Sequence, residues 1–272
     1  MSAITFTLKK VPAQRVDLSP LSSHLIAGMA PSEINGISLV SGKQRIRVDE
    51  LFNVSGETSD RLIFKNACDK LDRIGCDMQG GEILIEGDAG AYLGQGMRDG
   101  KIVVDGNAGA MAGCEMRGGL LQINGNVGDQ LGSELPGNKK GMQGGMIIVK
   151  GNCGDRVGDL MRRGTILVEG NVGDYCGTRM IAGTIAVMGN CGSHIGYGMN
   201  RGTLLLWNSP QIPASFVDCG FHTATVFLAL LFKSFRGLET KFAQSGVEFH
   251  RVRRYGGDLA ARGLGEILVK IQ

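Results

Sequence analysis

The chain has 272 residues and a mass of 28.8 kDa, which is enough for a substantial hydrophobic core in one or two domains. Its 44 glycines, 6 prolines and 43% hydrophobic residues favour an ordered fold with many turns over a disordered chain. A net charge of +3 gives no reason to expect nucleic-acid binding.

The sequence predicts a cytoplasmic protein that does not enter a membrane. Its first segment, MSAITFTLKK, lacks the apolar core of a signal peptide. The apolar run at 226–232 is far shorter than the ~20 residues that cross a bilayer. The seven cysteines include no C-x-x-C pair, and an odd number in a chain without a signal indicates reduced thiols.

Residues 1–60 follow no regular pattern and are predicted to form an N-terminal cap region. The segment AITFTL at 3–8 alternates apolar and polar residues, as an edge strand does. Segment 61–77, RLIFKNACDKLDRIGCD, resembles one unit of the repeat that follows, so we interpret it as a degenerate first coil. A charged, irregular cap protects the open end of such a repeat from end-to-end stacking.

A repeat occupies residues 61–207. Methionines recur every 19 residues, with one interval of 26, at Met78, Met97, Met116, Met142, Met161, Met180 and Met199. Numbered from its methionine, every unit has glycine at position 4, and the complete units also have glycine at positions 10, 13 and 17. Aliphatic residues at positions 6 and 8 lie on one face of a short strand.

This pattern predicts an all-β fold, namely a right-handed parallel β-helix with 19-residue coils. A strand of five residues cannot bury its apolar face alone, whereas stacked copies form a continuous core. We interpret the glycines at position 10 as structural corners with positive φ. These are Gly87, Gly106, Gly125, Gly151, Gly170 and Gly189.

Three columns of the repeat have a structural and a functional interpretation. The asparagines at position 11 fit a ladder along the axis, at a left-handed corner, better than a binding stripe. The methionines fit core filling better than a Cu(I) site. Asp129, Asp155 and Asp174 at position 14 fit a solvated corner better than a Ca²⁺ site or a polysaccharide-cleaving cleft. Arg156 and Arg163 are close enough in sequence to offset that charge.

No catalytic, cofactor-binding or metal-binding residue is predicted in this chain. The sequence has no phosphate-binding loop, no H-E-x-x-H zinc motif and no G-x-S-x-G nucleophile motif. The four histidines and the cysteines show no metal-ligand spacing, so we interpret the cysteines as structural.

One candidate partner-binding segment is the insertion SELPGNKKG at 133–141, which contains Lys139 and Lys140. It accounts for the single long interval of the repeat. Insertions in solenoid proteins map to one face, which is often the binding face. We therefore expect a contact loop here.

The repeat ends at Trp207, and residues 208–272 predict a short α/β C-terminal extension. A helix is expected over 221–237, packed over the open end or the side of the rod. A basic cluster follows, with Arg251, Arg253 and Arg254. Three arginines suit an acidic partner or a carboxylate-rich cofactor tail, and a solvated strand face explains them equally well.

The repeat, written MxGGxIxVxGNxGxxxG, resembles the glycine-repeat β-helix at the C-terminal end of glutamate synthase large subunits, over about residues 60–207. Over the whole chain, including the ending RRYGGDLAARGLGEILV, the sequence is similar to the C subunit of formylmethanofuran dehydrogenase. It is more similar still to the corresponding subunit of the formyltransferase/hydrolase complex of methylotrophic bacteria, with the dehydrogenase subunit as the alternative. No single residue decides between these two complexes.

The resemblance implies a non-catalytic scaffold subunit of a hetero-oligomer. In the bacterial complex, a formyl group passes from a tetrahydromethanopterin-type carrier to a methanofuran-type carrier on a formyltransferase subunit. A metal-dependent, amidohydrolase-like subunit then releases formate. In the archaeal dehydrogenase, a molybdenum or tungsten pterin subunit handles formate instead. The family places no catalytic residue in the β-helix subunit, so the resemblance implies carriers and metal held by other subunits.

Two alternatives belong to other classes of protein. A stand-alone polysaccharide-acting β-helix enzyme needs acids and bases clustered on one exposed face, and the aspartate column has no paired acid or histidine. A free-standing methanofuran-binding protein would use the arginines of 251–254. Identification of the proteins that accompany the chain in cells discriminates among the three.

Overall fold

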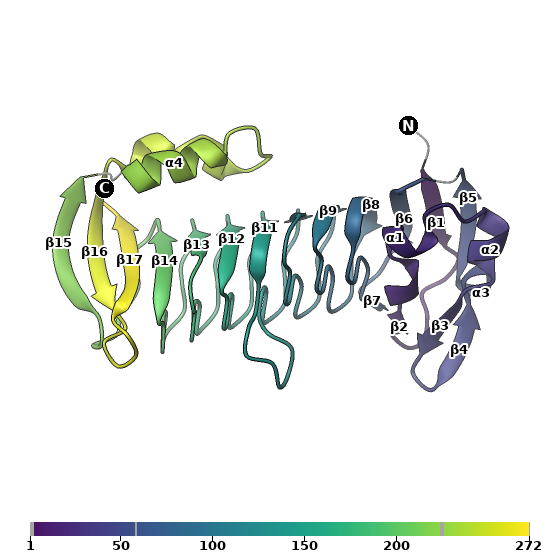
Figure 1. Ribbon diagram of the computed structural model, residues 1–272, viewed down its shortest axis with the longest axis horizontal. Coiled ribbons are helices and arrows are strands. Elements are labelled where there is room, and N and C mark those ends of the chain that lie inside the picture. The colour runs from purple at the N-terminus through teal and green to yellow at the C-terminus, as the bar shows by residue number, and fades with distance from the viewer. Residues whose placement is uncertain (1–2, 58, 224–225, 272) are drawn as a thin grey trace.

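The computed structural model describes residues 3–57, 59–223 and 226–271. The fold is mostly β: a thirteen-stranded sheet runs the length of an elongated molecule, and a four-stranded sheet lies at the N-terminal end. Figure 1 shows the middle strands as successive rungs between an N-terminal cap and a C-terminal extension. None of the helices in these ranges has the length and hydropathy of a transmembrane span.

The rungs are formed by equivalent positions of the repeat. Each strand pairs in parallel with the next, so that Ile102 aligns with Leu121 and Leu121 with Ile147. The predicted degenerate first unit joins the series, because Leu62 aligns with Ile83. The strands are β6 (Arg61–Ala67), β8 (Gln79–Gly87), β9 (Asp99–Val104), β10 (Leu120–Ile123), β11 (Gln143–Val149), β12 (Arg163–Val168), β13 (Thr184–Val187) and β14 (Arg201–Leu206).

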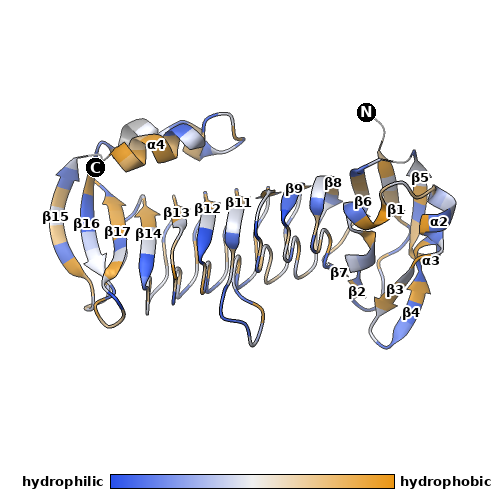
Figure 2. Cartoon of the chain, viewed as in Figure 1, coloured by the Kyte–Doolittle hydropathy of each residue, from blue (hydrophilic) through white to orange (hydrophobic). Residues whose placement is uncertain are grey.

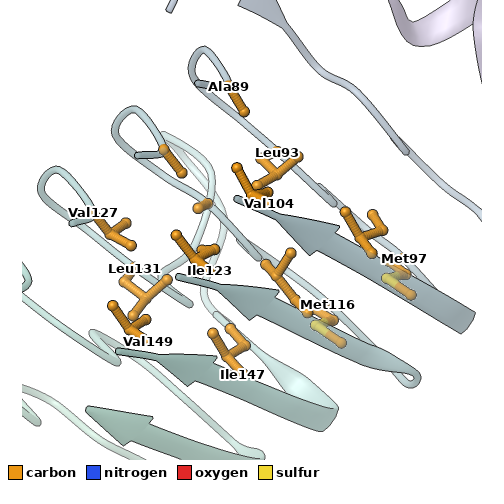
Figure 3. Packing of buried hydrophobic residues seen from close by; sticks show 14 of the residues in the cluster. Ala89, Leu93, Met97, Val104, Met116, Ile123, Val127, Leu131, Ile147 and Val149 are labelled. Atoms are coloured by element: carbon orange, nitrogen blue, oxygen red, sulfur yellow. The ribbon is translucent and has the colours of Figure 1, made fainter. Parts of the chain in front are cut away.

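The core of the rungs contains the aliphatic and methionine columns of the repeat. Figure 3 shows Met97 and Met116 beside aliphatic side chains near one end of the strands. Leu93 and Leu131 lie near the other end, next to Val104 and Val149. All of these side chains are at most 1% exposed. Position 12 closes the far side through isolated parallel bridges such as that between Ala108 and Val127. The interpretation of the methionines as core residues is confirmed.

The N-terminal cap contains strands of both sheets. Strands β1 (Ile4–Leu8) and β5 (Phe52–Gly56) extend the large sheet. The small sheet and the helices are β2 (Val16–Asp17), β3 (Ser38–Ser41), β4 (Gln44–Arg47), β7 (Leu71–Asp72), η1 (Ser19–Leu21), α1 (Ser23–Ile26), α2 (Pro31–Asn35) and α3 (Val48–Leu51). The prediction of an edge strand at 3–8 is wrong, since β1 lies between β6 and β5. The alternating pattern shows only that one face of the strand is buried. An internal strand whose other face is open to solvent has the same pattern as an edge strand.

The C-terminal extension closes the other end of the large sheet. β17 (Leu264–Lys270) pairs in parallel with β14, and β16 (Arg251–Gly257) pairs antiparallel with β17 and with the edge strand β15 (Val217–Thr223). The helical elements are α4 (Val226–Ser234), η2 (Lys241–Ala243) and η3 (Ser245–Phe249). The predicted helix over 221–237 therefore has the wrong bounds at both ends. Phe221 and Thr223 instead pair with β16, and residues 224–225 lie outside the described residues.

Helix α4 packs on the side of the rungs, not over their open end (Figure 1). Position 7 of the repeat points away from the inner core and is apolar in the units nearest α4. Its buried side chains include Ile148, Leu167 and Leu205, which form a second core with Leu228 and Phe232 of α4. In Figure 2, α4 and the neighbouring strands β14 and β17 are largely coloured as hydrophobic.

The backbone corners differ from the prediction. Positive φ is found at Gly87, but Gly170 and the other glycines of position 10 do not have it. These glycines are needed for close packing between coils: a Cβ on Gly170 would lie 2.4 Å from the carbonyl oxygen of Gly151 and 2.5 Å from Oδ1 of Asn152. Glycines of positions 4 and 17, such as Gly164 (φ 105°) and Gly177 (φ 69°), have the left-handed conformation.

At least one left-handed corner in each complete repeat unit is not glycine. Position 15 has φ between 58° and 62° in six successive coils: Tyr92, Met111, Gln130, Arg156, Tyr175 and His194. Such a conformation costs about 1–2 kcal/mol for a residue with a Cβ. Contacts between coils offset this cost, since the backbone N–H of Tyr175 donates to the carbonyl of Ser193 and its ring stacks on that of His194.

Candidate partner-binding surfaces

The two polar columns of the rod are hydrogen-bonded ladders. Oδ1 of Asn152 accepts a hydrogen bond from the backbone N–H of Asn171 at 2.8 Å, and Oδ1 of Asn171 accepts one from Asn190 at 2.8 Å. The aspartate column does the same, as Asp155 Oδ1 accepts from the N–H of Asp174. The predicted asparagine ladder is confirmed, but its acceptors meet backbone N–H groups and its residues do not have positive φ.

The predicted arginine cluster is divided between two faces of β16. Arg253 Nε donates to Asp218 Oδ2 at 3.1 Å, and its guanidinium lies over the rings of Phe221 and Tyr255. Hydrogen bonding from Arg253 lowers the pKa of Asp218 below its usual value. On the opposite face, Arg254 Nε donates to Glu266 Oε2 at 3.0 Å. Arg251 is exposed.

The insertion is tied to the rod at its base and exposed at its tip. The backbone N–H of Leu135 donates to Oε1 of Glu115 at 3.1 Å, and Asn138 Nδ2 donates to the same oxygen. Lys139 and Lys140 are exposed. Figure 1 shows this loop projecting from the rod between β10 and β11. The fixed base therefore presents the two lysines away from the core.

A charged network lies under the insertion. Asp159 is fully buried and accepts a hydrogen bond from Arg179 Nε at 2.8 Å. Arg156 Nη1 lies 3.5 Å from the same carboxylate, and Arg179 also pairs with Glu134 at 3.0 Å. Burial raises the pKa of Glu134. The expectation that Arg156 offsets the aspartate column is wrong, since its ion-pair partner is Asp159.

An exposed apolar surface lies on the outer side of the C-terminal extension. Val226, Phe227 and Leu230 of α4 are 76%, 44% and 61% exposed, and we refer to them as the outer face of α4. Phe221 on the edge strand β15 is 62% exposed. Exposed apolar clusters of this kind mark protein interaction sites.

A second surface, which the sequence interpretation missed, is a hollow of about 380 Å³ with a basic lining. We call it the arginine hollow; it is lined by Arg162, Arg163, Arg201, Arg262, Asn200, Ile181 and Ala182. Its signal in the sequence is a column: arginine occurs at positions 2 and 3 of the repeat. Arg163 therefore faces this hollow, and no ion pair between it and the aspartate column is found in the described residues.

Comparison with known proteins places this chain. The family model of the GXGXG motif matches residues 72–219. The chain belongs to the GXGXG motif family. The glycine columns that predicted the fold thus lie within the matched region.

Several curated relatives resemble part of the GXGXG chain. The C subunit of the tungsten-containing formylmethanofuran dehydrogenase 2 of Methanococcus maripaludis is 35% identical over 95 residues, 34% of this chain and 35% of that one. The C subunit of the formyltransferase/hydrolase complex Fhc of Methylorubrum extorquens is 37% identical over 89 residues, 33% of this chain and 34% of that one. The alignments span about a third of the length of these relatives.

A solved structure matches the GXGXG chain almost completely. It is the crystal structure of the formyltransferase/hydrolase complex FhcABCD of Methylorubrum extorquens with methylofuran. The match has a TM-score of 0.93 and 36% identity, and covers 98% of this chain and 100% of the matched chain. The likeness includes the cap and the C-terminal extension, which lie outside the glycine repeat.

The cysteines of this GXGXG chain are mostly buried. Burial raises the pKa of the Cys76 and Cys114 thiols to about 12, so both are neutral near pH 7 and poor nucleophiles. Cys219 is exposed. Within the described residues, no group of three or more His, Cys, Asp or Glu side chains is placed to hold a metal ion.

Proposed function

We propose that this chain is the scaffold subunit of a formyltransferase/hydrolase complex. The observation that carries the proposal is the whole-length likeness to one chain of FhcABCD, with a TM-score of 0.93 and 36% identity. A shared fold does not define a function, but a likeness that extends to the irregular cap and the C-terminal extension supports the same role in an assembly.

The role proposed for the fold is a rigid spacer. We infer a right-handed parallel β-helix with 19-residue coils over 61–207, a cap over 1–60 and an extension over 208–272. Partners joined to the two ends and the side of such a rod are held at fixed separations. The exposed Lys139 and Lys140 and the arginines of β16, Arg251, Arg253 and Arg254, are proposed contacts.

The proposed partners are a formyltransferase subunit and an amidohydrolase-like subunit in the cytoplasm. In this proposal the complex transfers a formyl group from a tetrahydromethanopterin-type carrier to a methanofuran-type carrier and releases formate. The metal belongs to the amidohydrolase-like subunit, and this chain holds neither carrier. The methylofuran in the FhcABCD crystal structure supports the choice of carrier.

A second candidate is the equivalent subunit of a molybdenum- or tungsten-containing formylmethanofuran dehydrogenase. The curated relatives from methanogens favour it, and their identities are close to that of the alignment with the Fhc relative. The two candidates share the scaffold role and differ in the partner that handles formate.

The test is purification of the tagged chain from its native cells, with mass spectrometry of the accompanying proteins. A formyltransferase together with an amidohydrolase-like protein is the expected result. A pterin-dependent formate-converting enzyme would assign the chain to the dehydrogenase. Recovery of the chain alone from a gentle lysate would contradict the scaffold role altogether.

The outer face of α4 gives this test a matched pair of variants. Phe227→Ser with Leu230→Ser removes exposed apolar side chains without touching either core, so we expect unchanged melting and a loss of co-purified partners. Val11→Ser with Val40→Ser makes a similar change at residues of the cap that are 62% and 46% exposed. Equal partner recovery from both pairs would exclude α4 as a docking element.

A further inference from the structure

The arginine hollow concentrates positive charge without internal compensation. Arg162, Arg163, Arg201 and Arg262 are all exposed. No carboxylate belongs to its lining, and among the residues that the structure describes no ion pair involves any of the four. Other arginines of the chain, such as Arg179, have partners within the chain. Four like charges around one hollow repel each other, which an anionic ligand relieves.

The walls of the hollow are set by the pairing of the rungs. The backbone N–H groups of Arg162, Ile181 and Asn200 each donate to a carbonyl of the preceding coil, at 2.8 Å. Ile181 and Ala182 occupy the positions that bear Arg162 and Arg163 one unit earlier and Asn200 and Arg201 one unit later. They therefore form the floor between two rows, one of Arg162 and Arg163 and the other of Asn200 and Arg201. Arg262 comes from the turn between β16 and β17.

The distance between the two rows determines which spacing of anionic groups in a ligand fits the hollow. Arg163 begins β12 and Arg201 begins β14, with β13 between them. Neighbouring strands lie about 4.8 Å apart, so the rows are separated by about 9.6 Å. Two anionic groups about that far apart can each form a bidentate pair with one row, while the guanidinium groups of the two rows stay apart and repel each other less. In a polyproline II segment, residues i and i+3 lie on one side at about 9.3 Å, which matches the rows.

We propose that the arginine hollow docks an extended acidic segment of a partner subunit, with carboxylates three residues apart on the two arginine rows. The apolar floor at Ile181 accommodates the residues between them. This inference rests on the proposed function, since it supplies the contact chemistry for one partner of the scaffold.

The first test uses the isolated full-length chain and two synthetic peptides of equal composition and charge. One contains Glu-Pro-Pro-Glu, which favours the polyproline II conformation, and the other contains Pro-Glu-Glu-Pro. Fluorescence anisotropy of labelled peptides at low salt is expected to show at least about ten-fold tighter binding of the first. Equal affinity for the two peptides, or binding of neither, would overturn the proposal.

Charge reversal separates the hollow from general attraction. Arg163→Glu with Arg201→Glu is expected to weaken binding of the spaced peptide by at least about ten-fold. Lys43→Glu with Arg45→Glu changes the net charge equally at exposed residues of the cap, and is expected to change the affinity less than about two-fold. A similar loss in both variants would mean non-specific attraction and refute a specific site.

The complex from native cells distinguishes failure of this inference from failure of the proposed function. Loss of one co-purified partner with the Arg163→Glu, Arg201→Glu variant supports the docking site. Full recovery of partners with that variant overturns the docking site and leaves the scaffold role intact. If the unaltered chain recovers no partner, the proposed function itself is wrong.

Discussion

At the scale of the residue, the glycines of positions 4 and 10 show that one residue type serves two different physical needs. Gly164 has positive φ, whereas Gly170 has ordinary backbone angles and a neighbouring coil where a Cβ would stand. Sequence alone shows that glycine is required at both columns. It does not separate the two reasons, because each leaves the same pattern.

The cost of crowding is testable at Gly170. Its replacement by alanine places a Cβ 2.4 Å from the carbonyl oxygen of Gly151, an atom of the backbone ladder that cannot move alone. We expect a loss of about 3 kcal/mol in the free energy of unfolding. The control is Gly36→Ala, where the nearest atom is 3.4 Å away and φ is −80°. Similar denaturant midpoints for both variants would contradict the crowding argument.

Asp258 gives a second prediction at this scale. Burial acts to raise its pKa, but hydrogen bonds from Ser215 and from the N–H groups of Gly198 and Ala260 outweigh it and lower the pKa. A carboxyl group whose pKa is lower in the folded protein stabilises the fold at pH values above its pKa in the unfolded chain, which is about 3.9. This stabilisation is lost as the pH falls through the pKa of the folded state.

We therefore expect Asp258→Asn to destabilise the protein by about 1–2 kcal/mol near pH 7. The difference from the unaltered chain should shrink below about pH 4. Urea unfolding at several pH values measures it, and a difference that is constant from pH 7 to pH 3 would rule out the ionised carboxylate as its source.

At the scale of the element, prediction from sequence succeeded where a pattern repeats and failed where it does not. Glycine and aliphatic columns placed β8 to β14 and their parallel register, because seven copies of one signal reinforce each other. Strand β15 has a single copy of its sequence, and Phe221 and Thr223 were assigned to a helix. Their pairing with β16 depends on contacts distant in the chain.

The second core is an element that sequence could have revealed. Ile148, Leu167 and Leu205 at the outward position 7 are apolar, which predicts a covering segment. The arginine hollow is harder to predict, because Arg262 reaches it from a turn that no periodicity places. The repeat thus predicts the two rows and the floor of the hollow, but it does not predict the contribution of Arg262.

The fluorescence of Trp207 reports on the packing of the helical segment 226–249, which covers the second core. Trp207 is the only tryptophan, and its ring centroid lies 4.3 Å from that of Phe249 and 5.1 Å from that of Phe242. Phe249→Ala should cost about 3–5 kcal/mol in the packing of the extension and shift the Trp207 emission to the red. Phe221→Ala, at an exposed side chain, is the control. An unshifted emission from Phe249→Ala would mean that the extension packs differently.

At the scale of the whole molecule, the insertion is expected to serve assembly more than folding. Excision of 136–140 retains Glu134 and its ion pair with Arg179. Shortening a surface loop changes the free energy of closure by less than about 1 kcal/mol, so melting should be nearly unchanged while recovery of partner subunits falls. Lys139→Ala with Lys140→Ala isolates the two charges. Intact assembly in both variants would remove the proposed role of the loop.

The pairing of successive rungs also makes the length of the molecule a quantised property. Each added or lost unit changes the distance between cap and extension by one strand spacing, about 4.8 Å. The 26-residue interval between β10 and β11 leaves that spacing unchanged, because Leu121 still aligns with Ile147. Two features of the chain can therefore vary independently. The number of repeat units sets the distance between cap and extension, and inserted loops change the surface along the rod without changing that distance.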